Sequence, residues 1–192
     1  MNLKFNNLVF QKFPIQESER LIFRKFDKKD APRLYQIRSN PKVMEYMDNI
    51  SLKSIEEAKF LIKSFKYDFK QQKGISWAIT DKQTNLLIGS FAFWRMVKQH
   101  CRAEIGYSLL PEYWGKGFMT ETFETLIEFG FGKMHLHSIE ANVNPQNQNS
   151  IKMLERIGFK KEAYFRENYF YLDKFIDSVI YSLLETDQRN YG

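Results

Sequence analysis

The sequence has few cysteines and no long apolar segment, and each of these shortages excludes a class of protein. Cys101 is the only cysteine in 192 residues, so the chain forms no internal disulfide, and such usage suits a reducing compartment. The longest strongly apolar run, near residues 86–94, is far too short to span a bilayer. Residues 1–13 lack the apolar core and the small-residue cleavage site of a signal peptide. We therefore expect a cytoplasmic protein with no membrane partner.

Two further shortages concern linkers and metals. The 5 prolines and 9 glycines form no linker and no low-complexity segment, so we expect one domain over residues 1–192, with residues 1–18 as an extra strand or an arm. Only 3 histidines are present. His135 and His137 lie two apart with no third ligand nearby, and no metal site is predicted.

The composition is that of a globular protein with an aromatic core. Apolar residues make up 43% of the chain, and 18 Phe and 10 Tyr are among them. The net charge is +6, from 29 basic and 23 acidic residues, which favours an acidic partner such as a polyphosphate cofactor, an acidic peptide or a ribonucleoprotein surface. No dense basic run is present, so direct nucleic-acid binding is not expected, and solvated lysines on helix faces also account for the charge.

Hydrophobic periodicity predicts a mixed succession of strands and helices. Strands are predicted at 20–26, 75–80, 86–97, 102–110, 138–143, 164–172 and 175–184, and helices at 31–38, from 54 to about 74, at 117–131 and at 148–157. The three strands between 75 and 110 read as an antiparallel meander. This order predicts an α+β fold with a mixed, mostly antiparallel sheet and helices on both faces. It argues against a doubly wound nucleotide fold, in which strand and helix alternate throughout.

The most informative segment runs from Glu104 to Glu121, EIGYSLLPEYWGKGFMTE. A strand opens through a Gly-Lys-Gly turn into a helix, where uncovered backbone amides and the helix dipole favour an anion. A P-loop needs Ser or Thr after the lysine, where Gly117 stands, and a dinucleotide fingerprint needs a third glycine at Thr120. The segment therefore predicts a backbone cradle for a pyrophosphate. Its donors are the amides of Gly115, Lys116, Gly117, Phe118, Met119 and Thr120, with Lys116 adding charge.

A second block, NPQNQNSIKMLERIGF, follows about 30 residues later, which fits a helical crossover. Asn147 is the predicted N-cap of its helix, and Gly158 ends it.

Together the two blocks resemble the GNAT superfamily of acyl-CoA N-acyltransferases. AEIGYSLLPEYWGKGFMTE is similar to its motif A and NPQNQNSIKMLERIGFKKE to its motif B. RLIFRKF and NPKVMEYM resemble the opening strand and helix of the branch that contains ribosomal-protein-alanine N-acetyltransferases. The resemblance covers roughly residues 19–184. One departure is Glu112, where Gln or Arg is usual, and a cradle of main-chain amides tolerates it.

The resemblance implies acetyl-CoA as the acyl donor and assigns residues to it. Leu109 and Leu110 would offer backbone groups to the pantetheine amides, and an amide near Leu109 would hold the oxyanion. Asn147 matches the residue that contacts the pantetheine arm, although it also reads simply as a helix cap. Ser150 would hydrogen-bond the departing thiolate, because the tyrosine often found four residues later is Leu154 here.

Glu104 is the candidate base. Alternation places it on the polar face of the strand with Arg102, Gly106 and Ser108, and we expect it near the end that leads to the turn. Transfer to an amine needs a neutral nucleophile, and a carboxylate can take the proton directly or through water. In the superfamily this position often carries the base. The alternative is a surface glutamate paired with Arg102.

The resemblance predicts an N-acetyltransferase acting on a primary amine, first of all the N-terminal amine of a ribosomal or other protein. A polyamine or an amine-bearing antibiotic is the alternative acceptor. The acceptor is expected to enter opposite the cofactor, between residues 40–52 and the last two strands. A non-catalytic acyl-CoA-binding module and a nucleic-acid-binding module are the other classes considered. A monomer or a homodimer is expected.

Overall fold

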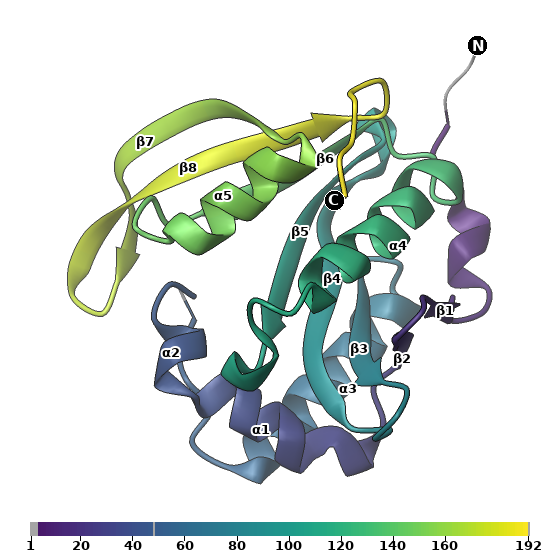
Figure 1. The fold of residues 1–192 in the computed structure, drawn as a ribbon, viewed down its shortest axis with the longest axis vertical. Coiled ribbons are helices and arrows are strands. Elements are labelled where there is room, and N and C mark those ends of the chain that lie inside the picture. Colours follow the sequence, from purple (N-terminus) through teal and green to yellow (C-terminus); the bar gives the residue numbers. More distant parts are fainter. Residues whose placement is uncertain (1–3, 48, 192) are drawn as a thin grey trace.

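An eight-stranded sheet forms the centre of the computed structural model, which describes residues 4–47 and 49–191 (Figure 1). The strands are ordered β1-β2-β3-β4-β5-β6-β8-β7. Their bounds are β1 Gln16–Glu17, β2 Leu21–Lys25, β3 Ile75–Asp81, β4 Leu87–Val97, β5 Arg102–Leu109, β6 Ser138–Val143, β7 Lys160–Tyr171 and β8 Lys174–Leu184. The α-helices are α1 Ala31–Ser39, α2 Pro41–Met44, α3 Ile55–Lys70, α4 Phe118–Gly132 and α5 Gln148–Ile157.

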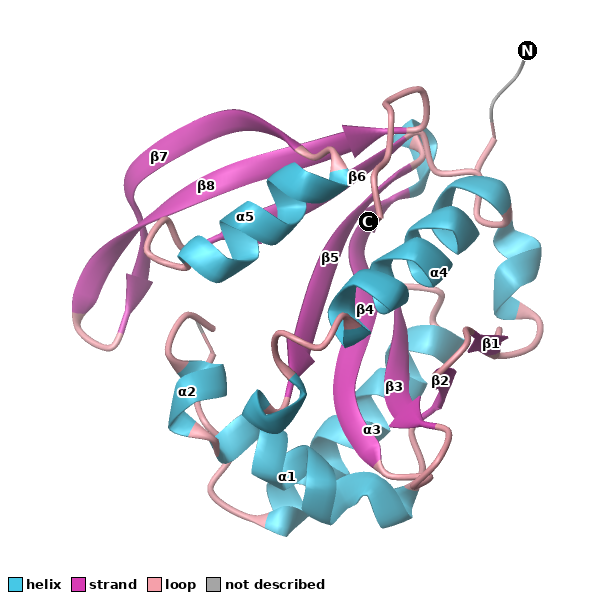
Figure 2. Ribbon diagram, in the orientation of Figure 1, coloured by secondary structure: helices cyan, strands magenta, loops and turns pink. Residues whose placement is uncertain are grey.

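Helices cover both faces of the sheet, as predicted (Figure 2). Successive residues of a strand point to opposite faces. In β3, Trp77 and Ile79 belong to the large core cluster that includes Phe123 of α4, whereas Ala78 belongs to the smaller cluster of α1 and α3. The fold is therefore the predicted α+β arrangement, with β3, β4 and β5 as an antiparallel meander.

The one parallel pairing among the ladders of the described residues joins β5 to β6. It holds for only three residue pairs, the last being Glu104 with Glu140. Beyond it the two strands diverge, with α4 beside β5 and α5 beside β6 (Figure 1). This opening exposes an edge of β5 in the middle of a sheet.

Several boundaries differ from the sequence-based prediction. The N-terminal segment, expected as an extra strand or an arm, contains the short strand β1 after a 3₁₀ turn, Asn7–Phe10. The strand β7 begins at Lys160, four residues before the predicted start. A short helix, α2, follows Asn40. The backbone of Asn40 is extended, as the following Pro41 requires, and the Asn40 side chain accepts a hydrogen bond from the amide of Lys42.

Two smaller findings complete the fold. The sequence predicts Cys101 to be a small buried residue of a strand. It is buried and free, but it lies in a left-handed turn just before β5 and not within the strand. Across residues 4–47 and 49–191, none of the helices combines the length and the apolarity needed to cross a membrane.

Candidate active site

The glycine turn places unpaired amides at the start of α4. Gly115 and Gly117 have φ values of 69° and 79°, a left-handed conformation that glycine adopts without strain. Gly117 is the N-cap, and the first amide bonded inside the helix is that of Glu121, which donates to the Gly117 carbonyl at 3.0 Å. The amides of Phe118 to Thr120 therefore have no partner within the helix. No side chain caps this end, so the amides are available to an anion.

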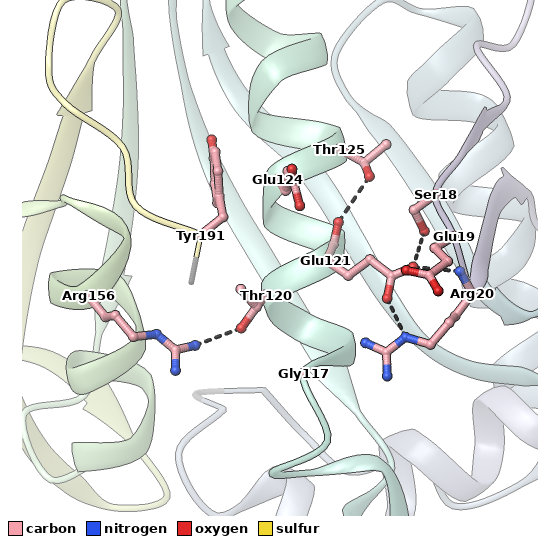
Figure 3. A pocket seen from close by; sticks show the side chains of 10 residues that line it. All are labelled: Ser18, Glu19, Arg20, Gly117, Thr120, Glu121, Glu124, Thr125, Arg156 and Tyr191. Carbon is pink, nitrogen blue, oxygen red and sulfur yellow. Dashed lines mark hydrogen bonds and ion pairs between the residues drawn. The ribbon is translucent and has the colours of Figure 1, made fainter.

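Two arginines far apart in the sequence flank this turn (Figure 3). Arg156 of α5 donates from Nη2 to Thr120 Oγ1 at 2.6 Å. Arg20 donates from Nη1 to the Lys116 carbonyl at 3.0 Å, and its Nε is 2.6 Å from Glu121 Oε2. Both arginines line an open cavity of about 690 Å³ beside α4. No local sequence signal identifies them, because their partners lie 96 and 36 residues away.

Glu121 fixes Arg20 in this position. It accepts hydrogen bonds from Ser18 Oγ at 2.6 Å and from the Arg20 backbone amide at 2.7 Å. Burial acts to raise the pKa of Glu121, but the bonds from Ser18 and Arg20 outweigh it, so the pKa lies below its usual value. An ionised Glu121 at neutral pH therefore holds the start of β2 against the first turn of α4.

The diverging edge of β5 offers backbone groups to a ligand. The Leu110 amide donates to Ile88 of the β4 side at 2.9 Å, so alternation turns the backbone of Tyr107 and Leu109 toward the opening. The Leu109 carbonyl accepts from Trp114 Nε1 at 2.9 Å, and the Leu110 carbonyl accepts from the Tyr113 amide at 3.0 Å. The two residues predicted to offer backbone groups, Leu109 and Leu110, therefore differ. Leu109 keeps an amide facing the opening, whereas the Leu110 amide is already used.

Asn147 is the N-cap of α5 and Ser150 lies in its first turn, as predicted. Asn147 Oδ1 accepts a hydrogen bond from the Ser150 amide at 3.1 Å, so Asn147 caps the helix. Ser150 Oγ lies 2.6 Å from the hydroxyl of Tyr107, which sequence reasoning did not select. Burial raises the pKa of Tyr107 to about 12, with the Ser150 bond opposing the shift. The phenol is therefore neutral across the physiological range.

Glu104 lies at the apex of the opening, where β5–β6 pairing ends. It is the third residue of β5 and so lies toward the start of the strand, not toward the turn as expected. Its partner is Arg95, at 3.2 Å, and Arg102 pairs instead with Glu140 at 3.2 Å. The predicted alternative pairing with Arg102 is therefore wrong. The Glu104 side chain is 13% exposed, and burial raises its pKa, with Arg95 opposing and Glu140 adding to the shift.

The segments expected to line the acceptor side meet in the structure. The hydroxyl of Tyr171, at the end of β7, donates to the Asn49 carbonyl at 2.6 Å. This bond joins the β7–β8 hairpin to the segment after α2. A separate cavity of about 350 Å³ lies between α1 and the end of β5, lined by Arg33, Gln36, Ser39, Asn40, Leu110 and Glu112.

In the described part of the chain, no three His, Cys, Asp or Glu side chains gather closely enough to hold a metal ion. The site instead consists of two arginines, free helix amides, a strand edge, a Tyr–Ser pair and a largely buried glutamate. Such a set suits an elongated anionic ligand that carries amide groups and a reactive end.

Comparison with known proteins agrees with this reading. Residues 20–160 match the family described as Acetyltransferase (GNAT) domain, and the chain belongs to this family. It is an acyltransferase, and acetyl-CoA is the acyl donor of the family.

Among curated relatives, an uncharacterized N-acetyltransferase, YoaA of Bacillus subtilis, is 34% identical over 173 residues, covering 90% of this chain and 98% of YoaA. The ribosomal protein uS5-alanine N-acetyltransferase of Escherichia coli is 30% identical over 119 residues, covering 62% and 61%. The spermidine N(1)-acetyltransferase of Vibrio cholerae is 23% identical over 173 residues, covering 90% and 98%.

Solved structures share the fold. A GNAT-family acetyltransferase from Bacillus anthracis has a TM-score of 0.79 at 26% identity, covering 90% of this chain and 99% of that one. The ribosomal L7/L12 alpha-N-protein acetyltransferase RimL, solved with coenzyme A, has a TM-score of 0.81 at 19% identity, covering 89% and 98%.

Proposed function

We propose that this protein transfers the acetyl group of acetyl-CoA to the N-terminal amine of a protein. The observation that carries the proposal is the opening between β5 and β6, with Glu104 at its apex and the Tyr107–Ser150 pair beside it. A donor threaded through this opening presents its thioester between a base on one face of the sheet and a hydroxyl pair on the other.

The donor end of the site binds acetyl-CoA and orients it. The amides of Phe118, Met119 and Thr120 hold the pyrophosphate, with Arg156 and Arg20 supplying positive charge beside them. Backbone groups of Tyr107 and Leu109 pair with the pantetheine arm as a strand would. This arrangement supports the sequence-based assignment of the turn, and it replaces Leu110 with Tyr107.

The chemistry then needs three groups. The amine nitrogen attacks the thioester carbonyl carbon, a C–N bond forms, and the C–S bond breaks. Glu104 accepts the proton that the amine loses, directly or through a water molecule. The Tyr107 amide, which also faces the opening and lies nearer Glu104 than the Leu109 amide does, stabilises the charge on the carbonyl oxygen. Ser150 donates a hydrogen bond to the departing thiolate.

Sequence similarity and net charge support a protein N-terminus as the acceptor. The uS5-alanine N-acetyltransferase is a relative at 30% identity, and the net charge of +6 disfavours a polycation. The spermidine N(1)-acetyltransferase, similar over 90% of this chain, keeps a small polyamine as the second candidate. The buried, free Cys101 supports a cytoplasmic site of action.

The test is a thiol-release assay with acetyl-CoA and a panel of amines: peptides beginning with Ala or Ser, spermidine, and an aminoglycoside. We expect turnover on the peptides, with mass spectrometry locating the acetyl group on the α-amine. Glu104→Gln should lower kcat/KM by about 100-fold or more. Turnover on spermidine alone would establish the second candidate. Acetyl-CoA binding without turnover on any amine would support a binding module.

A further inference from the structure

The strand β4 contains a bulge directly after Trp94, the residue that pairs with Glu104. Its pairing with β5 is regular up to Trp94 and Glu104, and the register then shifts before Val97 pairs with Arg102. Arg95 lies in this bulge with a φ of 44°, in the left-handed region. That conformation is strained for a residue other than glycine, because it brings Cβ close to the following carbonyl oxygen. Such outliers persist where the surrounding structure holds them, often beside active sites.

The bulge changes the face to which Arg95 points. Phe93 is buried in the large core cluster, so regular alternation would put Trp94 on the opposite face and return Arg95 to the core side. In the structure, the Arg95 guanidinium instead lies 4.3 Å from the Trp94 ring centre and 3.2 Å from Glu104 Oε2. All three side chains therefore gather on the face of the sheet where Glu104 ends the β5–β6 pairing.

We propose that Arg95 is a positioning residue for acetyl transfer: the β4 bulge aims its guanidinium so that it holds the Glu104 carboxylate at the apex of the β5–β6 opening. This inference rests on the proposed function, in which Glu104 accepts the proton of the amine. The guanidinium lies over the Trp94 ring while its Nη1 donates to the carboxylate, a pair of contacts that the compact ammonium of lysine does not reproduce.

Arg95 also governs the charge of Glu104. Two charged groups act on this carboxylate, Arg95 from β4 and Glu140 from β6, and the charge of Glu140 is itself shared with Arg102. Burial raises the pKa of Glu104, Glu140 raises it further, and Arg95 alone lowers it. Without Arg95, the two remaining influences act in the same direction, and the base is protonated at a higher pH.

The test compares Arg95→Gln, Arg95→Lys and Glu104→Gln with the unchanged enzyme. The control is Arg189→Gln, which breaks another arginine–glutamate pair, with Glu128 at 2.6 Å. The pH dependence of kcat/KM is measured with one acceptor, so that the titration of the amine is common to all variants. A carbon-13 NMR titration of the Glu104 carboxyl group gives a second readout that needs no turnover.

For Arg95→Gln we expect the acid limb of kcat/KM and the Glu104 midpoint to move to higher pH, with activity at pH 7 falling about tenfold and recovering in part at higher pH. The Glu104 midpoint and the activity of Arg95→Lys should lie between those of Arg95→Gln and the unchanged enzyme. Arg189→Gln should match the unchanged enzyme. Acetyl-CoA affinity should be unaltered in all four variants, which also shows that they are folded.

Two outcomes would overturn the inference: an unshifted Glu104 midpoint in Arg95→Gln, or a loss of activity equal at every pH. The proposed function has a separate test, the activity of Glu104→Gln. If Glu104→Gln turns over normally, Glu104 is not the base, whatever Arg95 does. If Glu104→Gln is impaired but Arg95→Gln leaves the profile unshifted, the base stands and the positioning role is wrong.

Discussion

The hydroxyl oxygens of Tyr107 and Ser150 lie 2.6 Å apart, although the two residues are separated by 43 positions and belong to β5 and α5. The contact spans the opening between the diverging halves of the sheet. The Tyr107 ring packs edge-on against the ring of Phe123 in α4, with 4.9 Å between the ring centres. Tyr107 is thus held rigidly enough to set the direction of the Ser150 hydroxyl.

This pair predicts an orienting role, not a proton transfer from the phenol. With a Tyr107 pKa of about 12 and a thiol pKa of roughly 8.5, moving the phenol proton to the thiolate is uphill by about 5 kcal/mol. We expect Ser150→Ala and Tyr107→Phe each to lower kcat by roughly 3- to 30-fold, and the double variant to resemble Ser150→Ala. Because Tyr107 titrates near pH 12, the ratio of kcat between Tyr107→Phe and the unchanged enzyme should be constant from about pH 6 to 9. Additive losses in steady-state kinetics would contradict a shared role.

The glycine turn predicts a loss of donor binding when either left-handed glycine gains a side chain. Gly115→Ala has free space, so its cost is backbone strain alone, whereas Gly117→Ala also brings a Cβ to 3.3 Å from Arg20 Nη2. We expect the Kd for acetyl-CoA, measured by calorimetry, to rise about tenfold, and more for Gly117→Ala. Gly132→Ala, at the other end of α4 with free space and no positive φ, is the matched control. An unchanged Kd in both turn variants would remove the cradle assignment.

The two arginines predict a defect that depends on the phosphates of the donor. Arg156→Ala and Arg20→Ala should each raise the KM for acetyl-CoA by about tenfold, since a hydrogen bond to a charged group contributes roughly 1.5–3 kcal/mol. Acetyl-pantetheine lacks the pyrophosphate, and its KM should be unchanged. Lys59→Ala on α3, where the lysine pairs with Glu56, controls for the loss of one positive charge. Equal defects with both donors would indicate a structural role for the arginines.

The bond between Tyr171 and Asn49 predicts a defect on the acceptor side only. Tyr171→Phe removes the hydroxyl that joins the β7–β8 hairpin to the segment after α2. We expect the KM for the acceptor to rise about 3- to 10-fold, because a typical hydrogen bond contributes about 0.5–1.5 kcal/mol. The Kd for acetyl-CoA should stay the same. A change in that Kd without a change in acceptor KM would place the hairpin on the donor side.

Much of the fold was predictable because its signals are local. Alternation of apolar residues gave the strands, and Asn147 and Gly158 bounded α5 as cap and stop. The turn at Gly115 and Gly117 followed from their spacing before a helix, and the structure shows that both glycines are left-handed. The first residue of β7 was missed because β7 is an exposed edge strand whose apolar residues do not alternate clearly.

The sequence by itself determined the family, the glycine turn before α4 and the face of β5 that carries Glu104, since each depends on local residue patterns. Only the tertiary structure decided which charges and hydroxyls meet. Arg20 reaches Lys116, Arg156 reaches Thr120 and Tyr107 reaches Ser150 because the sheet brings distant elements side by side. The bulge that turns Arg95 toward Glu104 likewise depends on how β4 pairs with its neighbour, and Glu104 pairs with Arg95 and not with Arg102. Periodicity specifies the face on which a side chain lies, but its partner is set by the packing of elements that the local sequence does not encode.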